Sequence, residues 1–521
     1  MSTPNAWLFG PHVALDRARQ SLSQDEHQRI LAPLQAGQPS AHRITQLRDA
    51  MLSGDPVNAS EQRAAGHWAL RLAGSRTPER HTLLPQRFAP NGEDLLPKMR
   101  RAHQHMTQLV EAVQSGAYHA SSGERFSDVI HLGIGGSDSG PQLLISALRT
   151  SRADLIPRVH FLANLDYHGV QHLLMQCDPQ RTLVVMVSKS FTTHETIHNA
   201  EHVLAWMRQA HVPHPERHLI AVTACPDRAQ QWSIPEHQIL WFDDSIGGRY
   251  SLWGPVSFTA RLALGNACVD AFLEGGLAMD AHAISTPLAR NLPAVLAATD
   301  AYNLRHRRIP TLMVSAYDSR LILLVPYLKQ LWMESLGKHI DRDGQPLDGP
   351  ACPILWGDVG TNAQHAFFQL LHQGAHGVAI DLIACVQPEH AARESHDALL
   401  ANFIAQGQAL ATGFTDENAH KTCWGGHPVN VMLLDRLSPE ALGALIGLWE
   451  YRVLALAALH HINPFDQWGV ELGKSMAQSA FGALHGDADP HNPSMSSANP
   501  TTGPVLDEIS RSLIQWLRDQ R

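Results

Sequence analysis

Two polar side chains near the middle of the chain have the types and spacing of an acid–base site. Gln330 and Glu334 are four residues apart in a segment whose apolar positions recur with the period of a helix. Residues four apart share a helical face, so amide and carboxylate should lie together beside an apolar stripe. A carboxylate partly removed from water suits a general base, and a solvated helix-end glutamate is the alternative. We expect Asp318 to cap this helix, Pro326 to kink it and Gly337 to end it.

A second polar group directly follows a strongly apolar run. Four hydroxyls stand within six residues, with a lysine among them: Ser188, Lys189, Ser190, Thr192 and Thr193. At the start of a helix, free backbone N–H groups and the helix dipole attract anions, so these hydroxyls could surround a phosphate monoester. Helix capping is the other interpretation, although it needs only one hydroxyl.

A glycine-rich segment predicts close approach of the backbone to a ligand. Gly133–Pro141 follows an apolar run and contains Gly136 and Ser137. Asp138 occupies the position of the third glycine of a dinucleotide fingerprint, and a Walker lysine is missing. The segment indicates either a ligand loop or a tight strand-to-helix turn.

An arginine that could point inward follows a glycine pair. Arg249 follows Gly247 and Gly248, as if directed inward by a flexible turn. A permanently charged guanidinium can stabilise a developing oxyanion. A surface arginine on a turn is the alternative.

Two further motifs carry titratable groups. His365 stands early in a predicted helix that Thr361 or Asn362 can cap, roughly opposite its apolar face. Near the C-terminus, the run Phe465–Lys474 contains Gln467, Glu471 and Lys474, a combination that a core helix does not need. Glu471 and Lys474 could also form a simple surface ion pair.

Composition narrows the class of protein. The net charge of −9 gives no electrostatic footprint for nucleic acid, and no basic amphipathic stretch suggests a membrane surface. Six cysteines without a CxxC pair suit free thiols in a reducing compartment, which predicts a cytoplasmic protein. The 33 histidines are scattered, so we expect no metal site. The apolar window 441–459 contains Glu450 and Arg452 and indicates a core helix.

Short apolar runs alternate with helical patterns, which predicts an α/β protein with doubly wound parallel sheets. The expected strands are 129–132, 159–162, 183–187, 219–222, 311–315, 378–384 and 429–434. We expect a smaller lobe at residues 95–265 and a larger lobe at 1–94 and 266–485. The first ninety residues look mostly helical, and residues 486–521 form a C-terminal arm with four prolines and a final helix over 505–518.

In this order, the motifs resemble those of glucose-6-phosphate isomerases over almost the whole chain. Asn58–Arg63 matches the family's N-terminal structural motif, and Gly247–Trp253 and Phe465–Lys474 are the most specific stretches. The sequence departs from the family pattern at three positions: Ser190 replaces Thr, His194 replaces Gln and Leu336 replaces Asn. We expect Leu336 to affect the rate more than the reaction.

The resemblance implies two sugar-isomerase-type lobes, a homodimer with shared active sites, and a sugar phosphate as substrate. The reaction that the resemblance implies needs neither a metal nor a nucleotide cofactor. It implies that Glu334 moves a proton between C2 and C1, that Arg249 stabilises the enediolate, and that His365 and Lys474 assist ring opening. His365 would come from the neighbouring subunit. The implied substrate-binding residues are Gly136, Ser137, Ser188, Lys189 (through its backbone), Ser190, Thr193, Gln330 and Gln467.

The implied reaction interconverts glucose 6-phosphate and fructose 6-phosphate in glycolysis and gluconeogenesis. A non-catalytic sugar-phosphate sensor is the alternative, but it need not combine Glu334, His365 and Lys474. A nucleotide-dependent oxidoreductase is disfavoured by Asp138.

Overall fold

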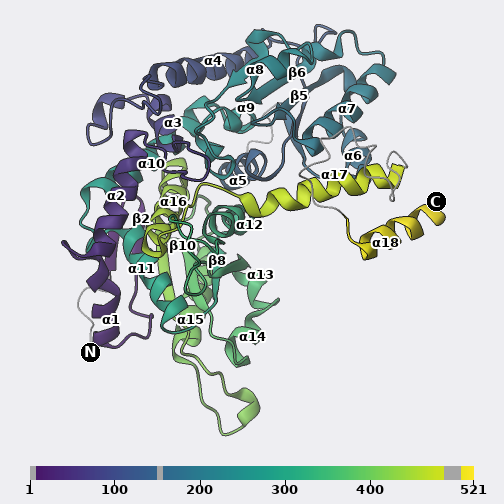
Figure 1. Ribbon diagram of the computed structural model, residues 1–521. Coiled ribbons are helices and arrows are strands. Elements are labelled where there is room, and N and C mark those ends of the chain that lie inside the picture. The colour runs from purple at the N-terminus through teal and green to yellow at the C-terminus, as the bar shows by residue number, and fades with distance from the viewer. Residues whose placement is uncertain (1–6, 150–156, 486–505) are drawn as a thin grey trace. The chain divides into compact units, whose positions relative to one another are not determined.

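The computed structural model describes residues 7–149, 157–485 and 506–521 (Figure 1). The chain divides into two compact units, one ending at Phe465 and the other beginning at Asp466. Two sheets, each with helices on both faces, belong to the first unit. The predicted α/β fold class with doubly wound parallel sheets is therefore confirmed.

The first sheet is wholly parallel, with the order β4-β3-β5-β6-β7. Successive β5 side chains alternate between two apolar layers, Leu183 and Val185 on one face and Val184 and Met186 on the other. Burial on both faces explains the apolar runs that predicted β3, β5 and β6, whereas the fourth predicted strand, β4, lies at the edge and is less buried. The strands are β3 (Asp128–Leu132), β4 (Arg158–Leu162), β5 (Thr182–Val187), β6 (Leu219–Thr223) and β7 (Ile239–Trp241).

The second sheet has the order β1-β2-β11-β10-β8-β9, parallel except for its two N-terminal strands. Those two strands were not among the predicted ones; they form a short hairpin that adds antiparallel to β11. The strands are β1 (Trp7–Gly10), β2 (Val13–Asp16), β8 (Thr311–Tyr317), β9 (Ile354–Val359), β10 (Ala379–Cys385) and β11 (Val429–Leu434).

Helices make up most of the remaining chain. In the first unit they are α1 (Gln24–Leu31), α2 (Pro39–Ser53), α3 (His67–Gly74), α4 (Leu96–Ser115), α5 (Ser139–Leu148), α6 (Tyr167–Leu174), α7 (His194–Gln209), α8 (Pro226–Gln230), α9 (Phe258–Leu264), α10 (Asn266–Ser285), α11 (Leu292–Arg305), α12 (Leu324–Lys329), α13 (Gly360–Gln364), α14 (Phe368–Gln373), α15 (Arg393–Thr412) and α16 (Pro439–His460).

Helix α16 is the central helix of the core, as its sequence predicts. Ser438 accepts a hydrogen bond from the Ala441 backbone at its start, and Pro439 occupies the first turn. In the described part of the chain, α16 alone is long and apolar enough to cross a membrane, but 94% of that window is buried inside the protein. Its buried Arg452 pairs with Asp300 and Asp381.

The second unit contains a short turn, η13 (Trp468–Val470), and two helices, α17 (Glu471–His485) and α18 (Glu508–Asp519). The amphipathic helix predicted over 505–518 is confirmed, and Asp507 caps it by accepting a hydrogen bond from the Ser510 backbone. The four prolines of the predicted arm (490, 493, 500 and 504) lie outside the described residues.

Candidate active site

The candidate site lies at the point in the first sheet where the order of successive strands reverses. Strand β3 has its successor β4 on one side and β5 on the other, so β3 and β5 flank the topological switch point. Ligands of open α/β sheets bind outside the carboxyl ends of strands at such a point. The glycine loop follows β3 and the hydroxyl loop follows β5, so both occupy this position.

The glycine loop packs directly against the backbone that precedes Arg249. A Cβ on Gly136 would lie 2.2 Å from the Gly248 carbonyl atoms and 2.6 Å from the Arg249 nitrogen. A Cβ on Gly135, whose φ is +59°, would lie 2.9 Å from Nε2 of Gln330. The glycines therefore allow three sequence motifs to meet, which a tight turn alone would not require.

Strand β3 also holds the glycine loop through a buried histidine that the sequence analysis did not single out. His131 is buried and donates from Nε2 to the Ser137 carbonyl at 2.7 Å, while its Nδ1 accepts from Oγ1 of Thr259 at 2.8 Å. Burial lowers the pKa of His131 to about 4. The imidazole is therefore neutral near pH 7, and it fixes the backbone of Ser137 without adding charge.

The hydroxyl loop stands at the start of α7, as predicted, and its hydroxyls are not used for capping. Thr193 occupies the N-cap position without a side-chain capping bond, and its Oγ1 lies 2.9 Å from Oγ of Ser188. Oγ of Ser190 lies 2.7 Å from Oγ1 of Thr192. Because the hydroxyls cluster with one another at a helix N-terminus, the capping interpretation is wrong and an anion site is favoured.

A buried phenylalanine and two polar contacts shape this loop. Phe191 is buried and adopts a φ of +54°, an uncommon conformation for a non-glycine residue. Nζ of Lys189 lies 3.0 Å from Oδ1 of Asp244, which directs the lysine side chain to that carboxylate. Arg228 donates to the Ser190 carbonyl at 2.7 Å.

Gln330 and Glu334 lie together, as their spacing predicts. Nε2 of Gln330 donates to Oε2 of Glu334 at 3.1 Å. The predicted single helix kinked at Pro326 is wrong, because Pro326 lies in the first turn of α12, where its missing N–H costs no hydrogen bond. The segment then continues as a π-helical turn, η11 (Gln330–Glu334), a form often found at functional sites, and the helix ends before Gly337 as expected.

Arg249 is buried and faces Glu334, so the interpretation as a surface arginine is wrong. One guanidinium nitrogen lies 3.2 Å from Oε2 of Glu334, whose side chain is 23% exposed. The other nitrogens donate to Oγ of Ser335 at 2.7 Å and to the Pro464 carbonyl at 2.6 Å. A carboxylate and a guanidinium thus meet at a half-buried position, as proton transfer next to a developing oxyanion requires.

His365 lies elsewhere in its helix than expected. The residue follows α13 (Gly360–Gln364) at its C-terminal end, and α14 begins only at Phe368, so the prediction of an early helical position is wrong. The helix is interrupted between α13 and α14. Phe368 and Leu371 are the buried residues of α14. The side chain of His365 is exposed, and among the described residues it makes no hydrogen bond to Arg249 or Glu334.

Gln467 and Lys474 belong to the second unit. Gln467 precedes η13, and Lys474 lies in the first turn of α17, where its Nζ is 2.8 Å from Oε1 of Glu471. The surface ion pair that the spacing allowed is therefore present within this unit.

Sequence reasoning missed the groups that hold Arg249. The sequence analysis gives no role to Ser335 or Tyr250, yet Ser335 is fully buried and bonded to both Arg249 and Tyr250. The third anchor is the carbonyl of Pro464, 215 residues from Arg249. No sequence pattern predicts a bond to a backbone carbonyl so distant along the chain. The Ser335 hydroxyl, in contrast, directly follows Glu334 and could have been considered.

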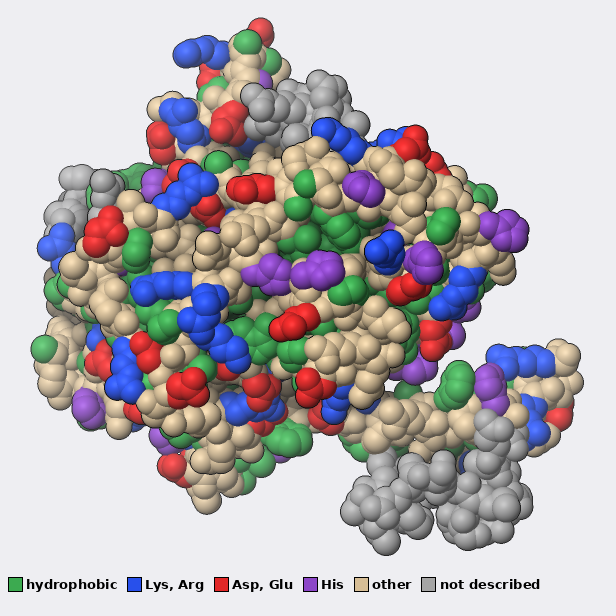
Figure 2. Space-filling model, turned by 90° about the horizontal axis from the view of Figure 1, so that it is seen from above, with side chains coloured by type: hydrophobic (Ala, Val, Ile, Leu, Met, Phe, Trp, Pro, Cys, Tyr) green, Lys and Arg blue, Asp and Glu red, His purple; other side chains and the backbone are tan. Residues whose placement is uncertain are grey.

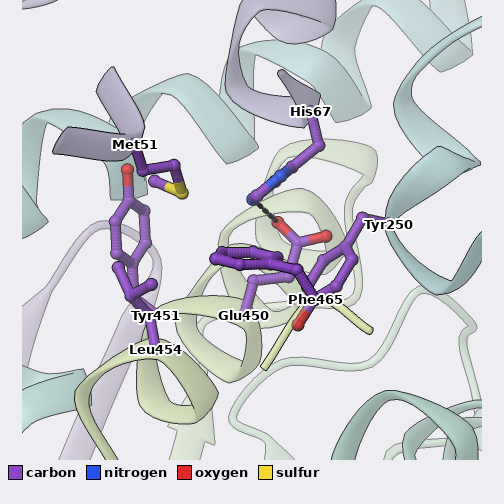
Figure 3. A pocket seen from close by; sticks show the side chains of 7 residues that line it. All are labelled: Met51, His67, Tyr250, Glu450, Tyr451, Leu454 and Phe465. Atoms are coloured by element: carbon purple, nitrogen blue, oxygen red, sulfur yellow. Dashed lines mark ion pairs between the residues drawn. The ribbon is translucent and has the colours of Figure 1, made fainter. Parts of the chain in front are cut away.

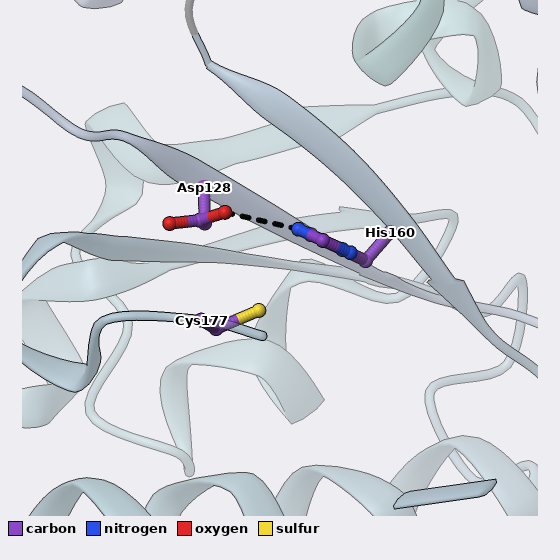
Figure 4. Close-up of side chains that lie close together, drawn as sticks. All are labelled: Asp128, His160 and Cys177. Carbon is purple, nitrogen blue, oxygen red and sulfur yellow. Dashed lines mark hydrogen bonds and ion pairs between the residues drawn. The ribbon is translucent and has the colours of Figure 1, made fainter. Parts of the chain in front are cut away.

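One cluster among the described residues has the composition of a metal site: Asp128, His160 and Cys177 (Figure 4). Nε2 of His160 lies 2.9 Å from Oδ1 of Asp128, and Arg158 lies 2.8 Å from the same oxygen. Burial and the neighbouring Asp128 raise the pKa of the Cys177 thiol to about 12. An arginine already neutralises the carboxylate, so this cluster is accounted for as an ion pair between the buried Asp128 and Arg158, whose side chain is 60% exposed.

Charged side chains on the outside show no single-sign surface in the view of Figure 2, where Lys and Arg lie among Asp and Glu. Histidines are scattered between them.

Comparison with known proteins agrees with this geometry. Residues 18–499 match the phosphoglucose isomerase family. The chain is 42% identical over 433 residues to glucose-6-phosphate isomerase of Rhizorhabdus wittichii, which covers 83% of this chain and 82% of that one. It is 40% identical over 506 residues to the enzyme of the same name from Stenotrophomonas maltophilia, covering 97% and 92%.

A solved structure gives the same result for the fold. The crystal structure of a glucose-6-phosphate isomerase from Chlamydia trachomatis superposes with a TM-score of 0.80 at 26% identity, covering 99% of this chain and 93% of that chain. The resemblance of the sequence motifs is thereby confirmed, and the chain belongs to the phosphoglucose isomerase family.

Proposed function

We propose that this chain interconverts D-glucose 6-phosphate and D-fructose 6-phosphate through an enediolate. One observation carries the assignment: the buried guanidinium of Arg249 lies 3.2 Å from the Glu334 carboxylate. A sensor of sugar phosphates would need the hydroxyl loop but has no use for this pair. The reaction belongs to glycolysis and gluconeogenesis.

The hydroxyl loop anchors the substrate at a distance from the reacting carbons. Ser188, Ser190 and Thr193 bind the phosphate, together with the backbone of Lys189, at the start of α7. Gly136, Ser137, Gln330 and Gln467 line the sugar. Binding energy from the unreactive phosphate then positions C1 and C2.

The chemistry consists of ring opening followed by proton transfer. His365 and Lys474 move a proton from the O1 hydroxyl to the ring oxygen, which opens the ring. The Glu334 carboxylate then takes the proton from C2, the C–H electrons form the C1–C2 double bond, and the carbonyl electrons move to O1. Arg249 stabilises the resulting oxyanion. The O2 proton passes to O1, the electrons left on O2 form the C2 ketone, and the electrons of the C1–C2 double bond take the proton that Glu334 returns to C1.

A solvent-exchange experiment tests this reaction. We expect the purified chain, with a chelator present, to convert glucose 6-phosphate into fructose 6-phosphate in heavy water and to place deuterium at C1 of the product and C2 of recovered substrate. The products are followed by proton NMR. Conversion that stops on addition of chelator, or no conversion at all, would contradict the proposal.

The proposed enzyme is a homodimer in which each active site receives His365 from the partner. Support comes from the exposed position of His365 after α13 and from the absence of a bond to the Arg249–Glu334 pair among the described residues. A mixture of inactive Glu334→Gln and His365→Ala subunits tests it after subunit exchange. With shared sites, random pairing in a two-fold dimer restores about a quarter of wild-type activity. Sites formed within one chain would restore none.

We also propose a cytoplasmic location and the lobe boundaries 95–265 and 1–94 with 266–485. The six cysteines are free, which suits a reducing compartment. Each proposed lobe contains one sheet. Limited proteolysis followed by mass spectrometry would test the boundaries, and cell fractionation would test the location.

A further inference from the structure

The guanidinium of Arg249 is held mainly by neutral groups. Nε donates to Oγ of Ser335 at 2.7 Å, and one terminal nitrogen donates to the Pro464 carbonyl at 2.6 Å. Oη of Tyr250 lies 2.9 Å from the same Oγ and 3.2 Å from the same carbonyl. Together these contacts close a ring of four hydrogen bonds around one edge of the guanidinium.

One placement of hydrogens satisfies all four bonds. Arg249 donates to Ser335, Ser335 donates to Tyr250, Tyr250 donates to the Pro464 carbonyl, and Arg249 donates to that carbonyl as well. Each hydroxyl then donates once and accepts once. Loss of either hydroxyl would leave a buried donor or acceptor without its partner.

Two neighbouring rings hold the Tyr250 ring in place, in the pocket drawn in Figure 3. His67 stacks on it with ring centroids 4.8 Å apart, and Phe465 lies against it at 5.6 Å. Burial raises the pKa of Tyr250, so the phenol keeps its proton. Burial and the nearby Arg71 hold the pKa of His67 well below its ordinary value, so the stacked imidazole is neutral.

Neutral anchors matter because Arg249 and Glu334 could otherwise cancel each other. Guanidinium and carboxylate groups favour a bidentate pair, with two parallel hydrogen bonds. Here a single bond of 3.2 Å joins them, because Ser335 and Pro464 occupy other donors. A bidentate pair would make Glu334 a weaker base and would remove positive charge from the place where the oxyanion forms.

We propose that Ser335 and Tyr250 are positioning residues of the isomerisation: they orient the Arg249 guanidinium toward the oxyanion and prevent it from pairing fully with Glu334. The inference rests on the proposed isomerase activity. Neither hydroxyl needs to touch the substrate for this role.

Ser335→Ala and Tyr250→Phe remove the two hydroxyls one at a time. For each variant we expect kcat to fall about 10- to 100-fold, as the loss of one buried hydrogen bond to a charged group predicts, while KM changes less than about threefold. The double variant should be little worse than the poorer single variant, because the hydroxyls belong to one ring of bonds. Ser257→Ala is the control: Ser257 is equally buried, but its hydroxyl donates to the Gly254 carbonyl and, among the described residues, makes no bond to Arg249.

Two probes separate positioning from general structural damage. D-Arabinonate 5-phosphate carries a carboxylate where the enediolate charge develops, whereas D-glucitol 6-phosphate is neutral there. Calorimetry should show affinity for the arabinonate falling about 10-fold or more in both variants, with affinity for the glucitol unchanged. The inference would be overturned if kcat of the two variants were unchanged, or if their affinity for both probes fell equally. If the wild type itself lacks turnover, the proposed function fails, and the two probes still decide whether Ser335 and Tyr250 orient Arg249.

Discussion

Replacing Glu334 by glutamine should abolish proton transfer while leaving the site intact. Both hydrogen bonds to this side chain, from Arg249 at 3.2 Å and from Gln330 at 3.1 Å, reach the same oxygen, Oε2. A glutamine amide oxygen can accept both, and its NH₂ group takes the place of Oε1. Glu334→Gln therefore changes the charge and the basicity with little change in shape.

The expected loss is large in kcat and small in binding. An amide cannot accept the C2 proton, and general bases contribute about 10²- to 10⁴-fold. We expect kcat to fall by about a thousandfold, which corresponds to ~4 kcal/mol in the activation barrier. KM should change less than about threefold, because the hydroxyl loop that is proposed to bind the phosphate follows β5 in the other sheet. Arabinonate 5-phosphate should bind at least as tightly, since Arg249 has lost its anionic neighbour.

The assay couples fructose 6-phosphate formation to an indicator enzyme and measures kcat and KM separately. Glu274→Gln is a matched control: Glu274 is 29% exposed and pairs with His81 outside the candidate site, so its kcat should be unchanged. Thermal unfolding of both variants checks that they are folded. If Glu334→Gln keeps more than about a tenth of the wild-type kcat, Glu334 is not the base.

Three further predictions concern the loops and the core. Gly136→Ala should lower kcat more than about tenfold and lower the melting temperature, because its Cβ would lie 2.2 Å from the Gly248 carbonyl; Gly169→Ala, with open space around it, is the control for both measurements. Thr193→Val should raise KM about 10-fold or more in steady-state kinetics with little loss of helix stability, since this hydroxyl makes no capping bond; an unchanged KM would remove it from the phosphate site. Burial lowers the pKa of His131 to about 4, so between pH 6.5 and 4 the unfolded state binds a proton that the folded state does not, and stability falls as the pH falls. Urea unfolding should show the wild type losing about 2 kcal/mol more between pH 7 and 5 than His131→Gln, and equal losses would contradict the assignment.

Strands could be predicted where burial on two faces imposed a continuous apolar run, as in β5 and β6. Strand β9 escaped because it combines Gly357 and Asp358 at the edge of its sheet, where polar residues are tolerated. The N-terminal hairpin escaped because its strands have only four residues each. Short edge strands are determined by the sheet they join, which a local pattern does not contain.

The candidate site was predictable where the residues that meet in space are also close together in the sequence. Gln330 and Glu334 meet because a helical turn brings positions four apart together, and the hydroxyl loop is contiguous in sequence. The position of His365 was not predictable, since the break between α13 and α14 falls within what looks like one helix. The anchors of Arg249 were missed because they depend on contacts between distant segments.

Those distant contacts also explain how Arg249 connects the loop after the first sheet's β3 with Glu334, which follows β8 of the second sheet. The backbone before Arg249 packs on the glycine loop that follows β3, whereas its guanidinium bonds to Ser335, just beyond the segment after β8, and to Pro464. Arg249 therefore links the glycine loop to the segment that carries Glu334. Because the proposed proton transfer depends steeply on the position of Glu334, small substitutions at the packed glycines should reduce turnover.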